Sequence, residues 1–254
     1  IKDDRKVSIY KTLNILFNLK KEKYDLIIDL QNSNRTKYYS LFFKFFSKVR
    51  INGTHKYSDY KYEYNKSDPP SVIDGLANQI KLLGINADTK PNLNFLEINY
   101  NNDLDILEKD FFIINPGCSN KNYYKKWSAK NYSIICNFLI SNKILPVLIG
   151  TEADRNSIEI IKKNEPTSLS LINNSPLEVI FSLAKNAIGA ISNDTGPAHL
   201  IASTNCKLHL VLSSKSNAKT VIPQSDNVTY SQADDINNIE PEDVIPIIKK
   251  IVNG

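Results

Sequence analysis

Residues 187–202, AIGAISNDTGPAHLIA, decide the fold class and point to the functional site. The apolar run 187–192 is typical of a buried strand, and Pro197 has the fixed φ and the missing amide donor of a first helical residue. Between them, Gly196 lets a ligand come close to the backbone. The helix that follows offers free amide groups and a positive dipole end. The stretch therefore predicts a strand, a tight loop and a helix that together form an anion site.

The polar residues of this stretch also have a simpler interpretation. Asp194 and Thr195 can merely cap the helix, which is the usual role of Asp or Thr before Gly-Pro, and spacing alone favours capping. His199 lies one turn into the helix, where a lone histidine is more often structural. The stretch by itself does not decide between a ligand site and a capped helix.

Short apolar runs alternate with helical segments throughout the second half of the chain. The runs lie at 111–115, 144–150, 168–172, 187–192 and 208–213. This alternation is the pattern of βαβ units and a parallel sheet. In such a sheet, ligands bind outside the carboxyl ends of the strands. The residues directly after each run are therefore the candidates for binding and catalysis.

Two further loops carry candidate residues. After the first run comes a loop that ends in Lys125, Lys126 and the only tryptophan, Trp127. A lysine here can place its ammonium group against a phosphate, but lysine pairs on loops are usually solvated, and tryptophan is more often packing than a binding platform. Glu152 follows the second run, where an acid can accept hydrogen bonds from a ribose diol. Alternatively, Glu152 is simply an acid in the first turn of a helix, where it interacts with the helix dipole and needs no ligand.

Several enzyme classes are disfavoured by missing motifs. The sequence has no GxGxxG, Walker lysine loop, HExxH or GxSxG, which argues against dehydrogenases, P-loop enzymes, zinc proteases and serine hydrolases. The three cysteines lack metal-type spacing and are an odd number, so they indicate neither a zinc site nor a disulfide framework, and a reducing compartment is the simplest inference. No apolar run approaches the roughly 18 residues that cross a bilayer.

The first part of the chain contains fewer strands. Residues 24–30, YDLIIDL, are typical of a continuous buried strand. The other elements that we expect there are helices at 9–20, 35–47 and 71–83 and a short strand at 49–52. Residues 86–110 lose this periodicity, so we expect two α/β domains, 1–105 and 106–254.

Charge is unevenly distributed over the 254 residues, whose net charge is +5. Residues 1–66 carry 15 basic and 7 acidic side chains, and residues 67–110 carry 3 and 8. A solvated lysine face is the commoner meaning, but a basic surface also suits an anionic partner. The aromatic helix at 35–47 is apolar nearly all round, which usually means core packing. As a hypothesis, its remaining face and the basic segment hold the protein against an anionic membrane.

Taken together, the segments resemble the ADP-heptose lipopolysaccharide heptosyltransferases, an inverting glycosyltransferase family (family 9) with the GT-B fold. The matching segments are YDLIIDLQNSNRT (24–36), INPG (114–117), KKW (125–127), LIGTEAD (148–154), SPLEVIFSLAKNA (175–187) and SNDTGPAHLIA (192–202). They follow the order of the family, and the Asp-Thr-Gly-Pro-x-His string is the most specific of them. The resemblance implies two Rossmann-like domains with parallel sheets that face a cleft, the amino-terminal one being incomplete.

The resemblance also implies roles for individual residues. The matching donor-side residues are Ser119, Lys125, Glu152, Asp194, Thr195, Gly196 and His199. In the family, the Asp-Thr-Gly string contacts the diphosphate of ADP-heptose, the lysine and the loop residue beside it face phosphate, and the acid binds ribose. The resemblance does not assign a role to the histidine. The resemblance suggests transfer that needs no metal and no other cofactor.

The amino-terminal domain is the acceptor side in this resemblance. It would grip the lipid A–inner core acceptor, and Asp29, Gln31 and Arg35 fall on that side. No nucleic acid partner is implied. The expected location is cytoplasmic, with peripheral contact at the inner face of the bacterial inner membrane.

The chain also departs from the family's pattern. Family members begin with a strand and a glycine-containing loop that bears the aspartate acting as acceptor base. This sequence starts at Ile1, without Met, at what looks like the third βα unit. We therefore expect a segment to be missing from its front, the general base to be absent, and catalysis by the chain as given to be slow. Asp29 is not a matching replacement for that base.

Three functions fit these observations. The leading one is heptosyl transfer from ADP-heptose to the lipopolysaccharide inner core. A nucleotide-sugar-binding partner without catalytic activity is the second, because such a module could lack the base. The third is a GT-B epimerase that uses the same half-site on another nucleotide sugar. An epimerase needs no acceptor, so product analysis separates it from a transferase.

Overall fold

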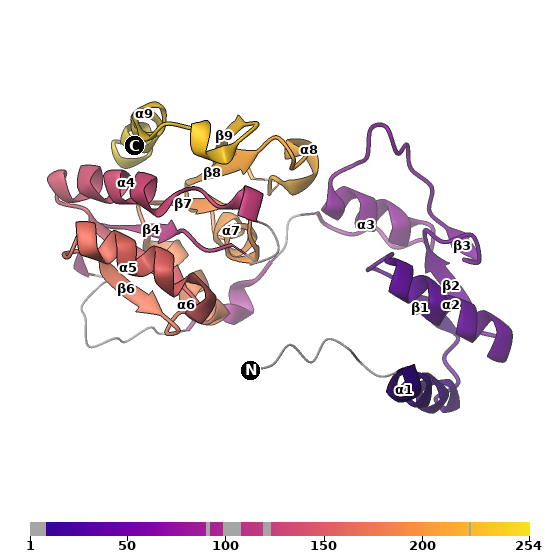
Figure 1. Ribbon diagram of the computed structural model, residues 1–254. Coiled ribbons are helices and arrows are strands. Elements are labelled where there is room, and N and C mark those ends of the chain that lie inside the picture. The colour runs from indigo at the N-terminus through magenta and orange to yellow at the C-terminus, as the bar shows by residue number, and fades with distance from the viewer. Residues whose placement is uncertain (1–8, 90–91, 99–107, 119–122, 224) are drawn as a thin grey trace. The chain divides into compact units, whose positions relative to one another are not determined.

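A computed structural model describes residues 9–89, 92–98, 108–118, 123–223 and 225–254 (Figure 1). The chain divides into two compact units, Ile1–Thr89 and Lys90–Gly254, and each has its own parallel sheet. Residues 94–98 go with the second unit, because the amide of Ile98 donates to Ser182 Oγ and Glu97 pairs with Lys185. The boundary expected after residue 105 falls among residues 99–107, outside the described part, and stays a prediction.

The first unit has a three-stranded sheet in the order β1-β2-β3. Its elements are α1 (Ile9–Lys21), β1 (Leu26–Ile28), α2 (Asn34–Phe46), β2 (Arg50–Gly53), β3 (Tyr60–Lys61) and α3 (Val72–Lys81). Helix α2 begins at a capping box between Ser33 and Thr36, and α3 begins at Ser71, whose side chain accepts from the Asp74 amide. These caps explain where the aromatic and amphipathic segments become helical.

The expectation of a continuous buried strand at 24–30 was wrong. Only Leu26–Ile28 forms a strand, and Leu26 and Ile28 are 38% and 39% exposed. The reason is that β1 is an edge strand of the described sheet, where it pairs with β2 alone. An apolar run predicts burial on both sides only when neighbours cover both sides. The small core of this unit instead lies between α1, α2 and β2, around Phe42, Phe43 and Ile51.

The second unit contains a six-stranded parallel sheet in the order β6-β5-β4-β7-β8-β9. Its strands are β4 (Phe111–Asn115), β5 (Leu145–Gly150), β6 (Leu169–Ile172), β7 (Gly189–Asn193), β8 (Leu208–Ser213) and β9 (Val228–Ala233). The five apolar runs all form strands, as the sequence predicts. Strand β9, VTYSQA, was not predicted, because an edge strand that is largely exposed has no apolar run.

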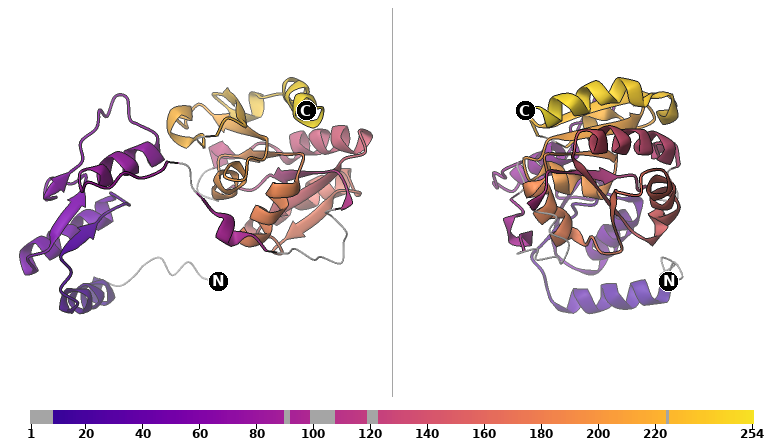
Figure 2. Two further views of the ribbon diagram at one scale, coloured as in Figure 1. Left: turned by 180° about the vertical axis from the view of Figure 1, so that it is seen from behind. Right: turned by 90° about the vertical axis from the view of Figure 1, so that its left-hand side faces the viewer.

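Helices cover both faces of this sheet (Figure 2). The helices are α4 (Ala129–Ser141), α5 (Arg155–Asn164), α6 (Leu177–Asn186), α7 (Gly196–Ala202), α8 (Ala218–Val221) and α9 (Pro241–Val252). Alternate residues of β4 point to opposite faces. Phe111 and Ile113 pack with α6 and α7, whereas Phe112 and Ile114 pack with α4, α5 and α9. Two cores therefore hold the sheet, and every residue of β4 is buried.

Two residues show how closely this unit is packed. A Cβ atom on Gly189 would lie 2.4 Å from Ile251 and 2.8 Å from Phe112, so α9 can approach the sheet only because this residue is glycine. Trp127 is fully buried, and its Nε1 donates to the Ile239 carbonyl over 2.9 Å. The tryptophan is therefore a packing residue, as the sequence favours. Among the helices within the described ranges, none is long and apolar enough to span a bilayer.

Candidate functional site

A cavity of about 520 Å³ opens at the carboxyl ends of β4, β5 and β7 in the second unit. Five of the predicted donor-side residues line it: Lys125, Asp194, Thr195, Gly196 and His199. The structure brings them together because the loops after parallel strands gather at one edge of the sheet. Ser119 lies outside the described residues.

Lys125 and Asp194 form an ion pair at this cavity. Nζ of Lys125 lies 2.6 Å from Oδ2 of Asp194, and the two side chains are 18% and 9% exposed. Burial lowers the pKa of Lys125, but its hydrogen bond to Asp194 and the charge of that carboxylate outweigh burial and hold the pKa above its usual value. The lysine is therefore a fixed cation at the cavity.

The side chains of Asp194 and Thr195 do not cap helix α7. The Thr195 hydroxyl accepts from Asn115 Nδ2 over 2.8 Å, and the residue makes no side-chain bond to the helix amides. The structure therefore does not show the side-chain capping of α7 that the simpler interpretation predicts. The first turn also offers fewer free amides than expected, because Pro197 has none and the Ala198 amide donates to the Thr195 carbonyl. Lys125 is thus the fixed cation at this edge.

The other donor-side residues lie in different surroundings. His199 stays partly exposed; burial of part of its ring lowers its pKa, and the charge of Asp194 opposes that effect. Glu152 is exposed and does not line the cavity. Its carboxylate accepts from Arg155 over 2.5 and 2.7 Å and from Asn173 over 2.8 Å. The Arg155 hydrogen bond, followed by that of Asn173, lowers its pKa to about 2.

Asp154, which was not predicted as a site residue, joins two of the loops. This carboxylate is 7% exposed and accepts from the Cys118 amide over 3.3 Å and from the Thr151 amide and hydroxyl over 3.0 Å each. A Cβ atom at Gly117 would lie 2.8 Å from the same carboxylate. The sequence did contain a signal, since Thr151 and Asp154 have the spacing of a capping box.

Asn193 was also missed as a residue that holds the site. Its Nδ2 donates to the Pro116 and Gly117 carbonyls over 3.1 Å each. Its Oδ1 accepts from the Trp127 amide over 3.2 Å and from the Tyr132 hydroxyl over 3.0 Å. One buried amide therefore fixes the loop after β4 and the segment that carries Lys125. No sequence motif marks this role.

The residues predicted for the acceptor side follow the carboxyl end of β1 in the first unit. Asp29 is buried, and its Oδ1 accepts from the amides of Gln31 and Asn32 over 3.1 and 2.9 Å. Gln31 and Arg35 are exposed and hydrogen-bond to each other over 3.3 Å. Asp29 therefore organises the turn, whereas the other two side chains are available to a ligand. Within the described ranges, no three His, Cys, Asp or Glu side chains gather as metal ligands.

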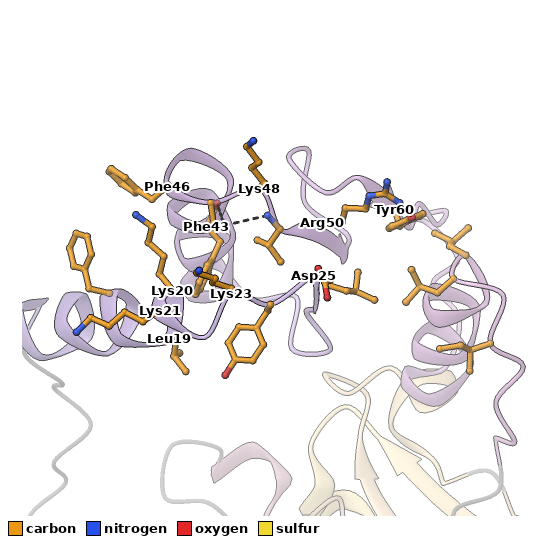
Figure 3. A pocket seen from close by; sticks show the side chains of 18 residues that line it. Leu19, Lys20, Lys21, Lys23, Asp25, Phe43, Phe46, Lys48, Arg50 and Tyr60 are labelled. Atoms are coloured by element: carbon orange, nitrogen blue, oxygen red, sulfur yellow. Dashed lines mark hydrogen bonds between the residues drawn. The ribbon is translucent and has the colours of Figure 1, made fainter.

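A larger cavity of about 1200 Å³ lies at the other end of the same sheet, where β1 and β2 begin (Figure 3). Five basic residues and one acid line it: Lys20, Lys21, Lys23, Lys48, Arg50 and Asp25. Phe43 and Phe46 of α2 supply apolar wall. Helix α2 thus buries one face, with Phe43 6% exposed, and leaves another to solvent, with Phe45 75% exposed.

Solved structures of known proteins share this fold. The glycosyl transferase family 9 protein of Veillonella parvula DSM 2008 superimposes with a TM-score of 0.74 at 15% identity, over 98% of this chain and 80% of that chain. ADP-heptose lps heptosyltransferase II of E. coli superimposes with a TM-score of 0.70 at 17% identity, over 96% of this chain and 81% of that chain. E. coli heptosyltransferase WaaC with ADP superimposes with a TM-score of 0.71 at 15% identity, over 96% of this chain and 79% of that chain. WaaC with ADP-2-deoxy-2-fluoro heptose is similar too.

These likenesses show an α/β fold of the GT-B type with two parallel sheets. A comparison with curated proteins finds no match. The model of one family, described as glycosyltransferase family 9 (heptosyltransferase), matches residues 13–242. Because that match spans most of the sequence, the chain belongs to glycosyltransferase family 9, the heptosyltransferases.

Proposed function

We propose that the protein transfers a heptose from ADP-heptose to the inner core of lipopolysaccharide, with inversion at the anomeric carbon. The observation that carries the proposal is the Lys125–Asp194 pair in the cavity of the second unit. A fixed ammonium group at the carboxyl edge of a parallel sheet suits a diphosphate. The membership of family 9 and the ADP complex of WaaC support ADP as the nucleotide.

Lys125 would act on the leaving group. Breaking the sugar–phosphate bond develops negative charge on the departing ADP, and a cation already in place stabilises that charge more as the bond breaks. The Asp194 carboxylate can only accept hydrogen bonds. A fully ionised diphosphate likewise has no donor, so the two groups cannot hydrogen-bond to each other. Asp194 would therefore orient Lys125 and keep it charged rather than touch the diphosphate with its side chain.

Ser119 and Glu152 belong to this proposal as further donor contacts. Ser119 would lie beside the phosphate, and Glu152 would accept hydrogen bonds from the ribose. Glu152 would first have to exchange its present partners, Arg155 and Asn173. Its contribution to affinity should therefore be smaller than that of the lysine.

The test combines ligand binding with turnover. Isothermal titration should detect ADP, and incubation with ADP-heptose and a heptose-free lipid A–core acceptor should give heptosylated lipid and ADP. Binding without turnover would instead support a partner without catalytic activity. A change in the sugar of the nucleotide sugar without acceptor would support an epimerase. A folded chain that does not bind ADP would remove the donor site.

The basic cavity of the first unit supports peripheral contact with the anionic cytoplasmic face of a membrane. Five cations against one carboxylate, next to phenylalanine side chains, suit a lipid surface that offers phosphate and apolar area. Lys23→Ala with Lys48→Ala should weaken co-sedimentation with anionic vesicles, and the same charge removal at the exposed Lys249 and Lys250 should not. Co-sedimentation that does not depend on the salt concentration or on the anionic lipid content of the vesicles would refute this contact.

A further inference from the structure

The cavity of the second unit offers little net positive charge to a diphosphate. Of the described residues that line it, Lys125 is a cation, whereas Asp154 and Asp194 are carboxylates. His199 adds no charge at neutral pH, because burial of part of its ring lowers its pKa. The Lys125 charge is already matched by Asp194 at 2.6 Å. A further cation close to this pair would therefore strengthen the binding of a diphosphate.

The turn at the end of β8, residues 213–216, leaves the sheet at the edge where the cavity opens. Strand β8 runs parallel to β7, and Val211 lies opposite Asn193 in their register. The residues that follow the two strands therefore emerge side by side at the carboxyl edge. The second residue after β8 is Lys215, which the family resemblance does not assign to the site.

This turn reaches the Lys125–Asp194 pair. The Ser216 hydroxyl lies 3.5 Å from Oδ2 of Asp194, the oxygen that also accepts from Lys125. Ser216 is 5% exposed, whereas the side chain of Lys215 is exposed. Lys215 forms no ion pair with any residue in the described part of the chain. Its positive charge is therefore available to a ligand at this edge.

The backbone of the turn is fixed by hydrogen bonds. Gln232 Nε2 of β9 donates to the carbonyls of Ser213 and Ser216 over 3.2 and 2.9 Å. The Ser216 amide donates to the Ser213 carbonyl over 2.9 Å, and the Lys215 amide donates to Ser213 Oγ over 3.3 Å. The Cα atom of Lys215 is thus held beside the pair, while its long exposed side chain can still change rotamer.

Tyr124 lies between the two lysines. Its ring centroid is 5.9 Å from the Lys125 ammonium group and 5.7 Å from the Lys215 ammonium group. The face of an aromatic ring attracts cations, so one ring can keep two like charges near each other. An anion that binds between the two ammonium groups also relieves their repulsion. The arrangement is therefore suited to a ligand with more than one negative charge.

We propose that Lys215 is a second cation of the donor site and contacts the diphosphate together with Lys125. This inference rests on the proposed function, because it takes ADP-heptose as the ligand. Lys125 keeps its bond to Asp194, and the Lys215 side chain turns from the Tyr124 ring toward the phosphate oxygens. Negative charge on the leaving ADP increases as the sugar–phosphate bond breaks, and a second ammonium group stabilises that charge. Lys215 therefore makes the site prefer diphosphates to the uncharged nucleoside.

Isothermal titration with ADP and with adenosine tests the contact. Lys215→Ala should weaken ADP binding about fivefold, the upper end of what an exposed ion pair contributes, and should leave adenosine affinity unchanged. Lys215→Arg keeps the charge and should retain most of the ADP affinity, whereas Lys215→Glu should lose more than the alanine variant. Added salt should reduce the difference between the wild type and Lys215→Ala, because salt screens exposed charges. Lys163→Ala removes an exposed lysine of α5 and should bind ADP like the wild type.

A double variant separates a direct contact from an effect on Lys125. If both lysines bind the diphosphate, the losses of binding free energy in Lys125→Ala and Lys215→Ala should add. If Lys215→Ala causes no further loss in the Lys125→Ala background, Lys215 acts only by orienting Lys125 through Tyr124, and the proposal is overturned. Unchanged ADP affinity in Lys215→Ala, or an equal loss of adenosine affinity, would overturn it too. A folded wild-type chain that binds no ADP would count against the donor site itself.

Discussion

The carboxyl edge of the second unit's sheet opens into a cavity, whereas that of the first unit's sheet is filled by its own side chains. In the second unit, a charged pair, Lys125 and Asp194, borders about 520 Å³ of space. In the first unit, the buried Gln79 side chain donates to the carbonyl of the buried Asp29, and the partly exposed His55 lies 3.5 Å from the Asp29 carboxylate. The edge in the second unit thus offers open space beside a cation, whereas the edge in the first unit holds its polar side chains against one another.

The difference follows from the strands beneath each edge. Every residue of β4 is buried between two layers of helices, so its loop starts from a rigid support. Strand β1 is three residues long and partly exposed. Its loop gains rigidity from side-chain hydrogen bonds instead. A strongly buried sheet can leave its edge open, but a small sheet needs that edge for its own stability.

The largest contrast should appear in unfolding. Phe112→Ala removes a fully buried ring from the second unit and should cost about 3–5 kcal/mol. Phe45→Ala removes an exposed ring from the first unit and should change stability by less than about 0.5 kcal/mol. Urea unfolding followed by circular dichroism and by the fluorescence of the single tryptophan, Trp127, measures both. Equal losses would refute this difference in packing.

The second contrast concerns pH. Burial of His209 lowers its pKa from 6.5 to about 4, so the folded chain keeps this ring neutral while the unfolded chain binds a proton below about pH 6.5. The stability of the second unit should therefore fall as the pH drops from about 6.5 to about 4, by about 1.4 kcal/mol per pH unit. Unfolding of His209→Gln at several pH values should lack this slope. An unchanged slope would mean that other groups cause it.

The third prediction concerns ligand binding at the open edge. Lys125→Ala should weaken ADP binding about tenfold or more, because a charge-assisted hydrogen bond is worth about 1.5–3 kcal/mol. Adenosine affinity should hardly change, since adenosine has no diphosphate. Isothermal titration compares the two ligands, and Lys130→Ala on the exposed face of α4 is the matched control. Equal losses of affinity for both ligands would show that the lysine acts on folding or contacts the adenine base.

The smallest effect is expected from Glu152. Its carboxylate is exposed and already bound to Arg155 and Asn173, so a ribose contact replaces bonds rather than adding them. Glu152→Gln should weaken ADP and adenosine equally and by less than about tenfold. Titration of both ligands measures this. A loss confined to ADP would mean that Glu152 acts near the diphosphate.

Local patterns were sufficient for much of the second unit. Its apolar runs span five to seven residues and end at or just before Gly, Asn, Asp or Ser, so the five strands and the loops that follow them could be predicted. Because ligands bind at the carboxyl ends of parallel strands, the sequence also predicts that Lys125, Asp194 and Thr195 lie on one side of the sheet. Family 9 membership was predicted from the same segments and is confirmed.

The sequence by itself determined the type of fold, five strands of the larger sheet and five of the residues at its cavity, because these depend on local apolar patterns and on the loops that follow them. Only the tertiary structure decided which groups pair. Asp194 binds Lys125 rather than the helix amides, Asp154 holds two loops together, and Asp29 meets His55. The partners are far apart in the chain, and no local pattern records which distant group a buried carboxylate will meet once the strands are assembled.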